Sequence, residues 1–155
     1  MGRVPALFAY EGTGAAVVQA LKFRDGRRLV TPLADALAEH VQCHPGMVCT
    51  WLPTTAARRR SRGFDQSELL ARAVARRLDM PCVRLLRRQS GESQTGLDRA
   101  HRADNVVFRP VAATTDPVLV LDDVCTTGAT LRAAVAALSG SGTGTIRCIT
   151  VARTP

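Results

Sequence analysis

Apolar residues recur along this chain with two spacings, which predict an alternation of helices and strands. The spacing typical of amphipathic helices occupies residues 12–23, 28–41, 65–78 and 129–138. Short apolar runs typical of strands occupy residues 47–52, 82–86, 106–111, 118–121 and 146–152. Because predicted helices and strands alternate along the chain, we expect an α/β fold with a mainly parallel central sheet and helices on both faces.

The strand predicted at residues 118–121 ends in two carboxylates. Its four consecutive aliphatic residues are typical of a strand buried on both faces of a parallel sheet. Asp122 and Asp123 follow at its carboxyl end, where such sheets bind their ligands. Neighbouring strand residues point to opposite faces, so both carboxylates can meet one ligand only if the chain is already leaving the strand. A ribose diol above that bend would suit them.

Small and hydroxyl-bearing residues connect the two aspartates to the next predicted helix. Thr126, Thr127, Gly128 and Thr130 fall on the loop and the first helical turn, where unpaired N–H groups and the helix dipole attract an anion. Gly128 also lets the backbone approach a ligand closely. The alternative is an ordinary helix cap that binds nothing, but a cap needs only one such residue. The pattern therefore favours a sugar-phosphate site.

Length, cysteine usage and hydropathy limit the class of protein. At 155 residues and 46% apolar composition, the chain is expected to form a single domain over residues 1–155. Its five cysteines include no Cys-x-x-Cys pair, which favours reduced, structural thiols in a cytoplasmic protein. Neither an apolar leader nor a stretch approaching the ~20 apolar residues of a membrane span is found.

Positive charge is concentrated in the middle of the chain. Residues 54–109 hold thirteen Arg and six acidic residues, so this segment carries +7 of the chain's net charge of +8. A polyanionic ligand such as a diphosphate or a nucleic acid would explain this. A solvated arginine-rich surface stays open as the alternative, because the chain has twenty Arg and one Lys. Within this segment, residues 87–104 lack any apolar period and predict a working loop or disorder.

The segment at residues 118–130 resembles the signature with which type I phosphoribosyltransferases bind phosphoribosyl diphosphate (PRPP). Further matches resemble the ComF-like branch of that family, which is associated with DNA uptake in competent bacteria. They are Leu-Lys-Phe at residues 21–23, Arg-Gly-Phe-Asp-Gln-Ser at residues 62–67, and the spaced Gln94, Leu97, Arg102 and Asn105. The resemblance covers most of residues 10–153 and implies the type I phosphoribosyltransferase fold.

The resemblance implies roles for individual residues. Asp122 and Asp123 would be the catalytic pair and hold the ribose hydroxyls. The PRPP-binding run would comprise Asp122, Asp123, Val124, Cys125, Thr126, Thr127, Gly128, Ala129 and Thr130, with residues 126–130 around the 5-phosphate. The diphosphate side would comprise Thr54, Thr55, Arg58 and Arg62, and a mobile loop closing over the site would contain Gln94 and Arg102.

The implied reaction is displacement at the anomeric carbon of PRPP, with diphosphate leaving as a ribosyl cation develops. Mg²⁺ would be bound mainly through PRPP, so no residue is assigned as a metal ligand. The acceptor cannot be read from the sequence, and a homodimer is left open. We find no internal membrane span and no four-Cys site resembling the N-terminal zinc module of many ComF-like proteins, so either this branch lacks that module or the chain starts late.

Two departures from the ComF-like pattern lie on the diphosphate side. Asp65 stands where these proteins usually have Asn, and Thr50-Trp51-Leu52-Pro53 replaces Pro-Val-Pro.

Two functions therefore compete. The first is a phosphoribosyltransferase. The second is a non-catalytic protein of the same fold that binds single-stranded DNA or senses PRPP. Competence proteins stay open as further partners under either function. The arginine-rich middle favours the second, whereas the scarcity of aromatic residues there disfavours it.

Overall fold

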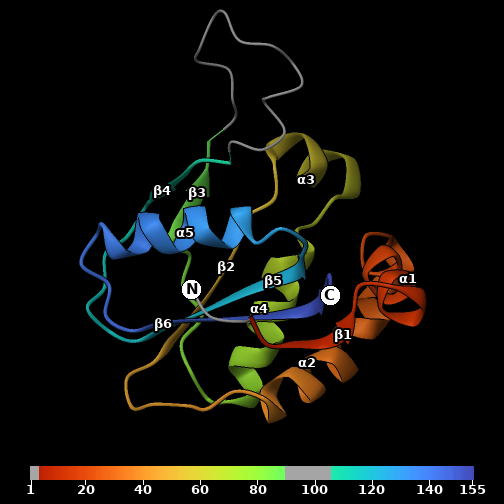
Figure 1. Cartoon of the computed structure of the whole chain (residues 1–155), viewed down its shortest axis with the longest axis horizontal. Helices are drawn as coiled ribbons and strands as arrows, with labels where there is room; N and C mark the ends of the chain where they lie inside the picture. The colour runs from red at the N-terminus through yellow and green to blue at the C-terminus, as the bar shows by residue number, and fades with distance from the viewer. Residues whose placement is uncertain (1–3, 90–105) are drawn as a thin grey trace, which may run out of the picture.

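A parallel sheet of four strands forms the centre of the computed structural model, which describes residues 4–89 and 106–155 (Figure 1). In spatial order, the strands are β1 (Ala6–Ala9), β6 (Ile146–Arg153), β5 (Val118–Cys125) and β2 (Val48–Trp51). Each neighbouring pair runs parallel. This confirms the predicted parallel sheet and places the motif strand β5 inside it, between β6 and β2.

Helices cover both faces of the sheet, as the sequence predicts (Figure 1). The helices on one face are α1 (Gly12–Ala20), α2 (Val30–Glu39) and α4 (Gln66–Arg77). The 3₁₀ helix η1 (Arg24–Leu29) connects α1 to α2. Leu37 and Leu70 lie on that face in the same buried apolar cluster as Leu121 of β5. The other face is covered by α5 (Ala129–Ser139), whose Leu131 packs with Val120. Burial of apolar side chains on both faces explains why β5 is aliphatic without alternation.

Three strands differ from their predicted form. The edge strand β1 was not predicted, because four residues with partly exposed side chains give little periodicity. The strand expected at residues 82–86 is divided between a single bridge from Cys82 to Cys49 and the start of β3 (Leu86–Arg88). β3 pairs antiparallel with β4 (Phe108–Pro110) as a separate two-stranded ribbon, so neither strand joins the central sheet.

The arginine-rich segment before residue 65, where no helix was predicted, is a helix, α3 (Ala56–Arg62). Thr55 caps it by accepting a hydrogen bond from the Arg58 N–H at 3.2 Å, and Gly63 ends it in the left-handed conformation with φ of 78°. None of its residues is buried, so the segment has no apolar stripe from which a helix could be predicted.

The described ranges, 4–89 and 106–155, contain no helix with the length and hydropathy needed to span a membrane.

The start of α1 packs closely against β1. A Cβ atom added to Gly14 would overlap the carbonyl oxygen of Ala9 and lie 2.8 Å from the Phe8 Cβ. The overlapped oxygen belongs to the backbone, so it cannot move aside as a flexible side chain could. Only glycine allows this contact between the helix and the strand.

We therefore expect Gly14→Ala to lower the free energy of unfolding by about 2 kcal/mol, the typical cost of forcing extra volume into a packed site. Urea denaturation of both proteins measures the difference. Ala16→Ser, at an exposed position of the same helix, is the control and should change stability by less than about 0.5 kcal/mol. Equal stability of the Gly14→Ala variant and the wild type would contradict the close packing.

Candidate functional site

Two helices begin beside the carboxyl end of β5. α4 starts at Gln66, on one face of the sheet, and α5 starts at Ala129, directly after β5 in the chain. α4 contacts both β5 and β2. The positive ends of two helix dipoles are thus close to the strand end that carries Asp122 and Asp123, which makes this edge electrostatically suited to an anion.

Both aspartates are held by the first turn of α4. The Ser67 hydroxyl donates to Asp122 Oδ1 at 3.0 Å, and the Gln66 amide donates to Asp123 Oδ2 at 3.0 Å. Asp122 Oδ1 also accepts the Asp123 N–H at 2.9 Å. Asp123 is buried and Asp122 is partly buried. The structure therefore brings the two predicted carboxylates together through two residues of the 62–67 run to which the sequence assigned no role.

The chain does not leave the sheet at the aspartates, contrary to the expected bend. Asp122 still pairs with Thr150 of β6, and pairing continues to Cys125. The side-chain alternation changes instead: Leu121 packs in the core beneath α4, but so does Val124, three positions further on. A regular strand would separate these positions onto opposite faces. The irregularity between them lets both carboxylates approach α4.

The environment of Asp122 disfavours its charged form. Burial raises the pKa of this carboxyl well above its ordinary value, and the neighbouring charge of Asp123 raises the pKa further. Hydrogen bonds from the Asp123 N–H and the Ser67 hydroxyl act in the opposite direction. The pair thus stores like-charge repulsion that a ligand donating hydrogen bonds would relieve.

The loop after β5 lies where the sequence predicts it. Thr126 and Thr127 are exposed, Gly128 precedes α5 with φ of 74°, and the Ala129 N–H donates to Thr127 Oγ1 at 3.3 Å. Thr130 follows in the first turn, so residues 126–130 surround the N-terminus of α5. Val124 packs against the buried apolar cluster that contains Leu121, and Cys125 belongs to the one that contains Leu131. Both side chains therefore stabilise the fold.

Arg132 joins this loop without having been predicted. Its Nη1 donates to the Thr127 carbonyl oxygen at 2.9 Å and would lie 3.0 Å from a Cβ on Gly128. The guanidinium therefore restrains the loop and adds a positive charge beside it. Its place in the first turns of α5 is readable from the sequence, but its contact with Thr127 depends on the loop's conformation.

The residues expected on the diphosphate side lie between β2 and α4. Thr54 directs its N–H to Asp65 Oδ2 at 2.8 Å, so this amide is engaged within the protein. The hydroxyl of Thr55 caps α3, Arg58 is exposed on that helix, and the half-buried Arg62 donates to Gln66 Oε1 at 3.1 Å. Arg62 is thus connected to Asp123 through Gln66.

Asp65 organises the start of α4. Its buried carboxylate accepts the N–H groups of Ser67 at 3.1 Å and Glu68 at 3.4 Å, besides that of Thr54. Burial raises the pKa of Asp65, while these backbone donors lower it. Asp65, which stands where ComF-like proteins usually have Asn, therefore still caps the helix and contacts the loop after β2.

Arg88, at the end of β3, is a second cation that the sequence did not indicate. It is half-buried, and its guanidinium lies over the Phe108 ring at 5.9 Å from the centroid. Burial lowers the pKa of Arg88, nearby Arg58 lowers it further, and Asp122 raises it. Arg88 is thus within electrostatic reach of both Arg58 on α3 and Asp122. The two predicted mobile-loop residues, Gln94 and Arg102, lie outside the described residues.

Comparison with known families shows which family the chain belongs to. The model of the phosphoribosyl transferase domain matches residues 65–155, which include Asp65, both aspartates and the loop after β5. The chain belongs to this phosphoribosyl transferase domain family. The resemblance to phosphoribosyltransferases is therefore confirmed at the level of the family.

Solved phosphoribosyltransferases are similar in structure. The hypoxanthine phosphoribosyltransferase of Staphylococcus aureus is 14% identical, with a TM-score of 0.48 over 89% of this chain and 65% of its own. The adenine phosphoribosyltransferase of Leishmania tarentolae is 16% identical, with a TM-score of 0.49 over 81% of this chain and 71% of its own. The chain thus spans 65% of the hypoxanthine enzyme's length. A search of curated proteins found no match.

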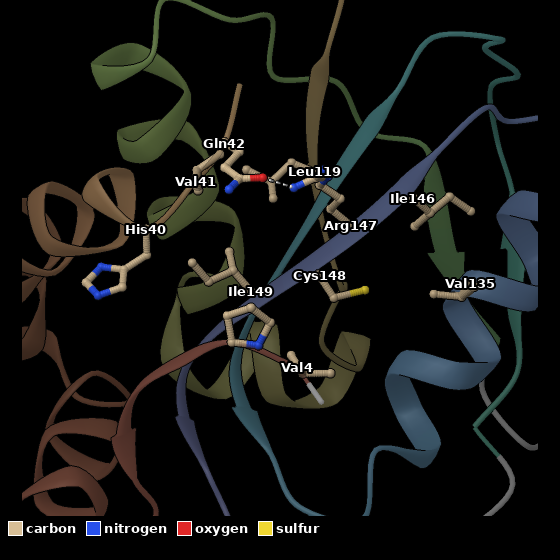
Figure 2. A pocket seen from close by; sticks show the side chains of 11 residues that line it. Val4, His40, Val41, Gln42, Leu119, Val135, Ile146, Arg147, Cys148 and Ile149 are labelled. Atoms are coloured by element: carbon tan, nitrogen blue, oxygen red, sulfur yellow. Dashed lines mark hydrogen bonds between the residues drawn. The ribbon is translucent and has the colours of Figure 1, made fainter. Parts of the chain in front are cut away.

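A cavity of about 450 Å³, shown in Figure 2, has neither of the two aspartates in its lining. Leu119 and Arg147, near the amino ends of β5 and β6, line it together with Gln42. The side chain of Arg147 donates to Gln42 Oε1 at 3.0 Å across its rim. Ligands of parallel sheets bind at the opposite, carboxyl ends of the strands, so this cavity is separate from the candidate site.

The raised pKa of Asp122 predicts a pH-dependent effect of Asp122→Asn on stability. A carboxyl with a raised native pKa stabilises the fold below its unfolded pKa of about 3.9, and this contribution is lost as pH rises through the native pKa. Asparagine stays uncharged at every pH. The variant should therefore be more stable than wild type at pH 7, and this difference should disappear near pH 4.

Urea denaturation at both pH values measures this difference, with Asp116→Asn as the control at an exposed position. A variant that is less stable than wild type at pH 7 would show that the Asp122 charge stabilises the fold, against this account.

Proposed function

We propose that this chain binds PRPP at the carboxyl end of β5 and transfers its phosphoribosyl group to an acceptor, with release of diphosphate. The observation that carries the proposal is the pairing of Asp122 with Asp123 beside the N-terminus of α5, in a chain of the phosphoribosyl transferase domain family. Carboxylates suit the hydroxyls of a ribose, and a helix N-terminus suits its phosphate.

The loop after β5 would bind the 5-phosphate. Its exposed threonine hydroxyls and the free N–H groups of the first turn of α5 are donors, and Arg132 adds charge beside them. Gly128 leaves room for a phosphate to approach the backbone. With the ribose held at the aspartates, the anomeric carbon would face the arginines of the diphosphate side.

Diphosphate would be bound by guanidinium groups from two elements. Arg62 reaches inward from α3 and Arg88 lies at the end of β3, near Asp122. Planar guanidinium groups bind phosphate oxygens in pairs, which suits a leaving group that gains negative charge. Arg58 lies close enough to Arg88 for the two charges to interact. A diphosphate would relieve the repulsion between them.

Mg²⁺ fits this site as an ion carried by PRPP. The donor set beside the ribose position consists of the two aspartate carboxylates, and Mg²⁺ prefers oxygen ligands. When bound, the ion supplies neutralisation of the departing diphosphate. The protein side chains would orient PRPP, and Asp122 and Asp123 would place negative charge near the ribosyl cation as it develops. Neither aspartate is assigned as a general base.

We place the chain in the ComF-like branch and in the cytoplasm, with a link to DNA uptake and a homodimer as parts of the same proposal. The motif at residues 62–67 supports the branch, because its Gln66 and Ser67 contact the aspartate pair directly.

Isothermal titration with PRPP and Mg²⁺ tests the proposed site. Wild-type protein should bind, and the Asp122→Asn, Asp123→Asn double variant should lose binding while it stays folded, because the ribose hydroxyls lose their charged acceptors. Asp116→Asn, at an exposed site, should bind as the wild type does. Unchanged affinity in a folded double variant would refute the assignment of these carboxylates. Release of diphosphate in the presence of an acceptor would then establish transfer.

The second candidate function is binding of single-stranded DNA. The exposed Arg58, Arg59 and Arg60 on α3 favour it, since a row of exposed guanidinium groups suits a polyanion. If it is correct, oligonucleotide affinity should fall steeply with salt, and Arg59→Ala with Arg60→Ala should reduce the slope of log K against log salt by about 2. A slope that the double substitution leaves unchanged would argue against DNA binding on α3.

A further inference from the structure

The two carboxylates at the end of β5 have neutral donors as partners. Ser67 contributes a hydroxyl and Gln66 an amide, and these two side chains are only 2% and 6% exposed. A cation in either place would cancel part of the charge that a ribose diol needs. A neutral donor fixes the orientation of a carboxylate and leaves its net charge unchanged. The choice of donors therefore suits a pair that must stay available to a ligand.

The Gln66 side chain has two hydrogen-bond partners of opposite charge. Its Oε1 accepts from Arg62 Nη1 at 3.1 Å, and its Nε2 donates to Asp123 Oδ2 at 3.0 Å. A guanidinium can only donate and an ionised carboxylate can only accept, so these partners determine which way the amide faces. The amide also separates Arg62 from Asp123. A direct ion pair, which would neutralise both groups, is thereby replaced by a connection that keeps both charged.

The backbone of this turn is fixed as well. Asp65 caps α4 through the N–H of Ser67 and holds the N–H of Thr54 with its other oxygen. The same turn of α4 therefore contacts the loop after β2, the arginine helix α3 and both aspartates of β5. No other turn among the described residues is shown to connect all of these parts of the proposed site.

We propose that Gln66 and Ser67 are positioning residues of the PRPP site, which hold the Asp123 and Asp122 carboxylates for the ribose, and that Gln66 couples Asp123 to Arg62. The inference rests on the proposed function, because it concerns the affinity for PRPP. It goes beyond that function in assigning the orientation of both sides of the site to one helical turn. Neither residue needs to touch PRPP itself.

Titration of purified variants with PRPP and Mg²⁺ tests the coupling. Ser67→Ala and Gln66→Met each remove a hydrogen bond to a charged group, so each should weaken binding about tenfold. Gln66→Glu keeps the shape of the side chain but sets a third carboxylate against Asp123, so it should weaken binding at least as much as Gln66→Met. If Gln66 served only to fill space, the isosteric glutamate would be the milder change.

A double-substitution cycle distinguishes coupling from two independent effects. Arg62→Ala combined with Gln66→Met should weaken binding less than the product of the two single effects, because either change already breaks the connection. Arg60→Ala, on the same helix but exposed, is the matched control. Its effect should multiply with that of Gln66→Met. Circular dichroism and thermal unfolding establish that each variant is folded, and Ser67→Ala tests the same turn should Gln66→Met not fold.

The outcomes separate the inference from the function on which it rests. Wild-type protein that fails to bind PRPP overturns the proposed function and this inference together. Wild-type binding that Ser67→Ala and the Gln66 variants leave within twofold overturns the inference alone. So does an Arg62 cycle that multiplies as the Arg60 cycle does. Losses about tenfold, a harmful Gln66→Glu and a non-multiplicative Arg62 cycle support it.

Discussion

Two negative charges held side by side at the end of β5 are the constraint on which the site depends. Asp122 and Asp123 repel one another, and partial burial removes water that would screen them. Donors from α4 hold this pair in place, the cap at Asp65 holds α4, and the same cap engages the loop after β2. Three segments of the chain, namely the end of β5, the start of α4 and the loop after β2, are therefore held together around one unfavourable contact between charges.

This arrangement favours ligand binding and lowers the stability of the free protein. Six polar or charged residues are buried in the described part of the chain, and four of them are Asp65, Gln66, Ser67 and Asp123. Apolar side chains in these places would cost no desolvation of polar groups. A ligand that donates hydrogen bonds to the aspartates and accepts them at α5 would supply the partners that the free protein lacks. Binding sites commonly retain such a compromise between stability and activity.

Local patterns in the sequence were sufficient for three of the four strands of the central sheet, its two covered faces and the loop at residues 126–130, because each depends on neighbouring residues. α3 could not be predicted, since a helix with no buried residue has no apolar period. The contacts of Gln66 and Ser67 with the aspartates could not be predicted either, because they join positions 57 and 55 residues apart. The family resemblance included both residues but gave no reason for them; the fold supplies that reason.

A crystal structure of the chain with PRPP and Mg²⁺ tests the central claim most directly, because it shows where the ribose lies. The account predicts both ribose hydroxyls within hydrogen-bonding distance of Asp122 and Asp123, with the 5-phosphate on the N–H groups at the start of α5 and the diphosphate toward Arg62. A ribose bound away from the two carboxylates, with the Gln66 and Ser67 hydrogen bonds intact, would contradict it.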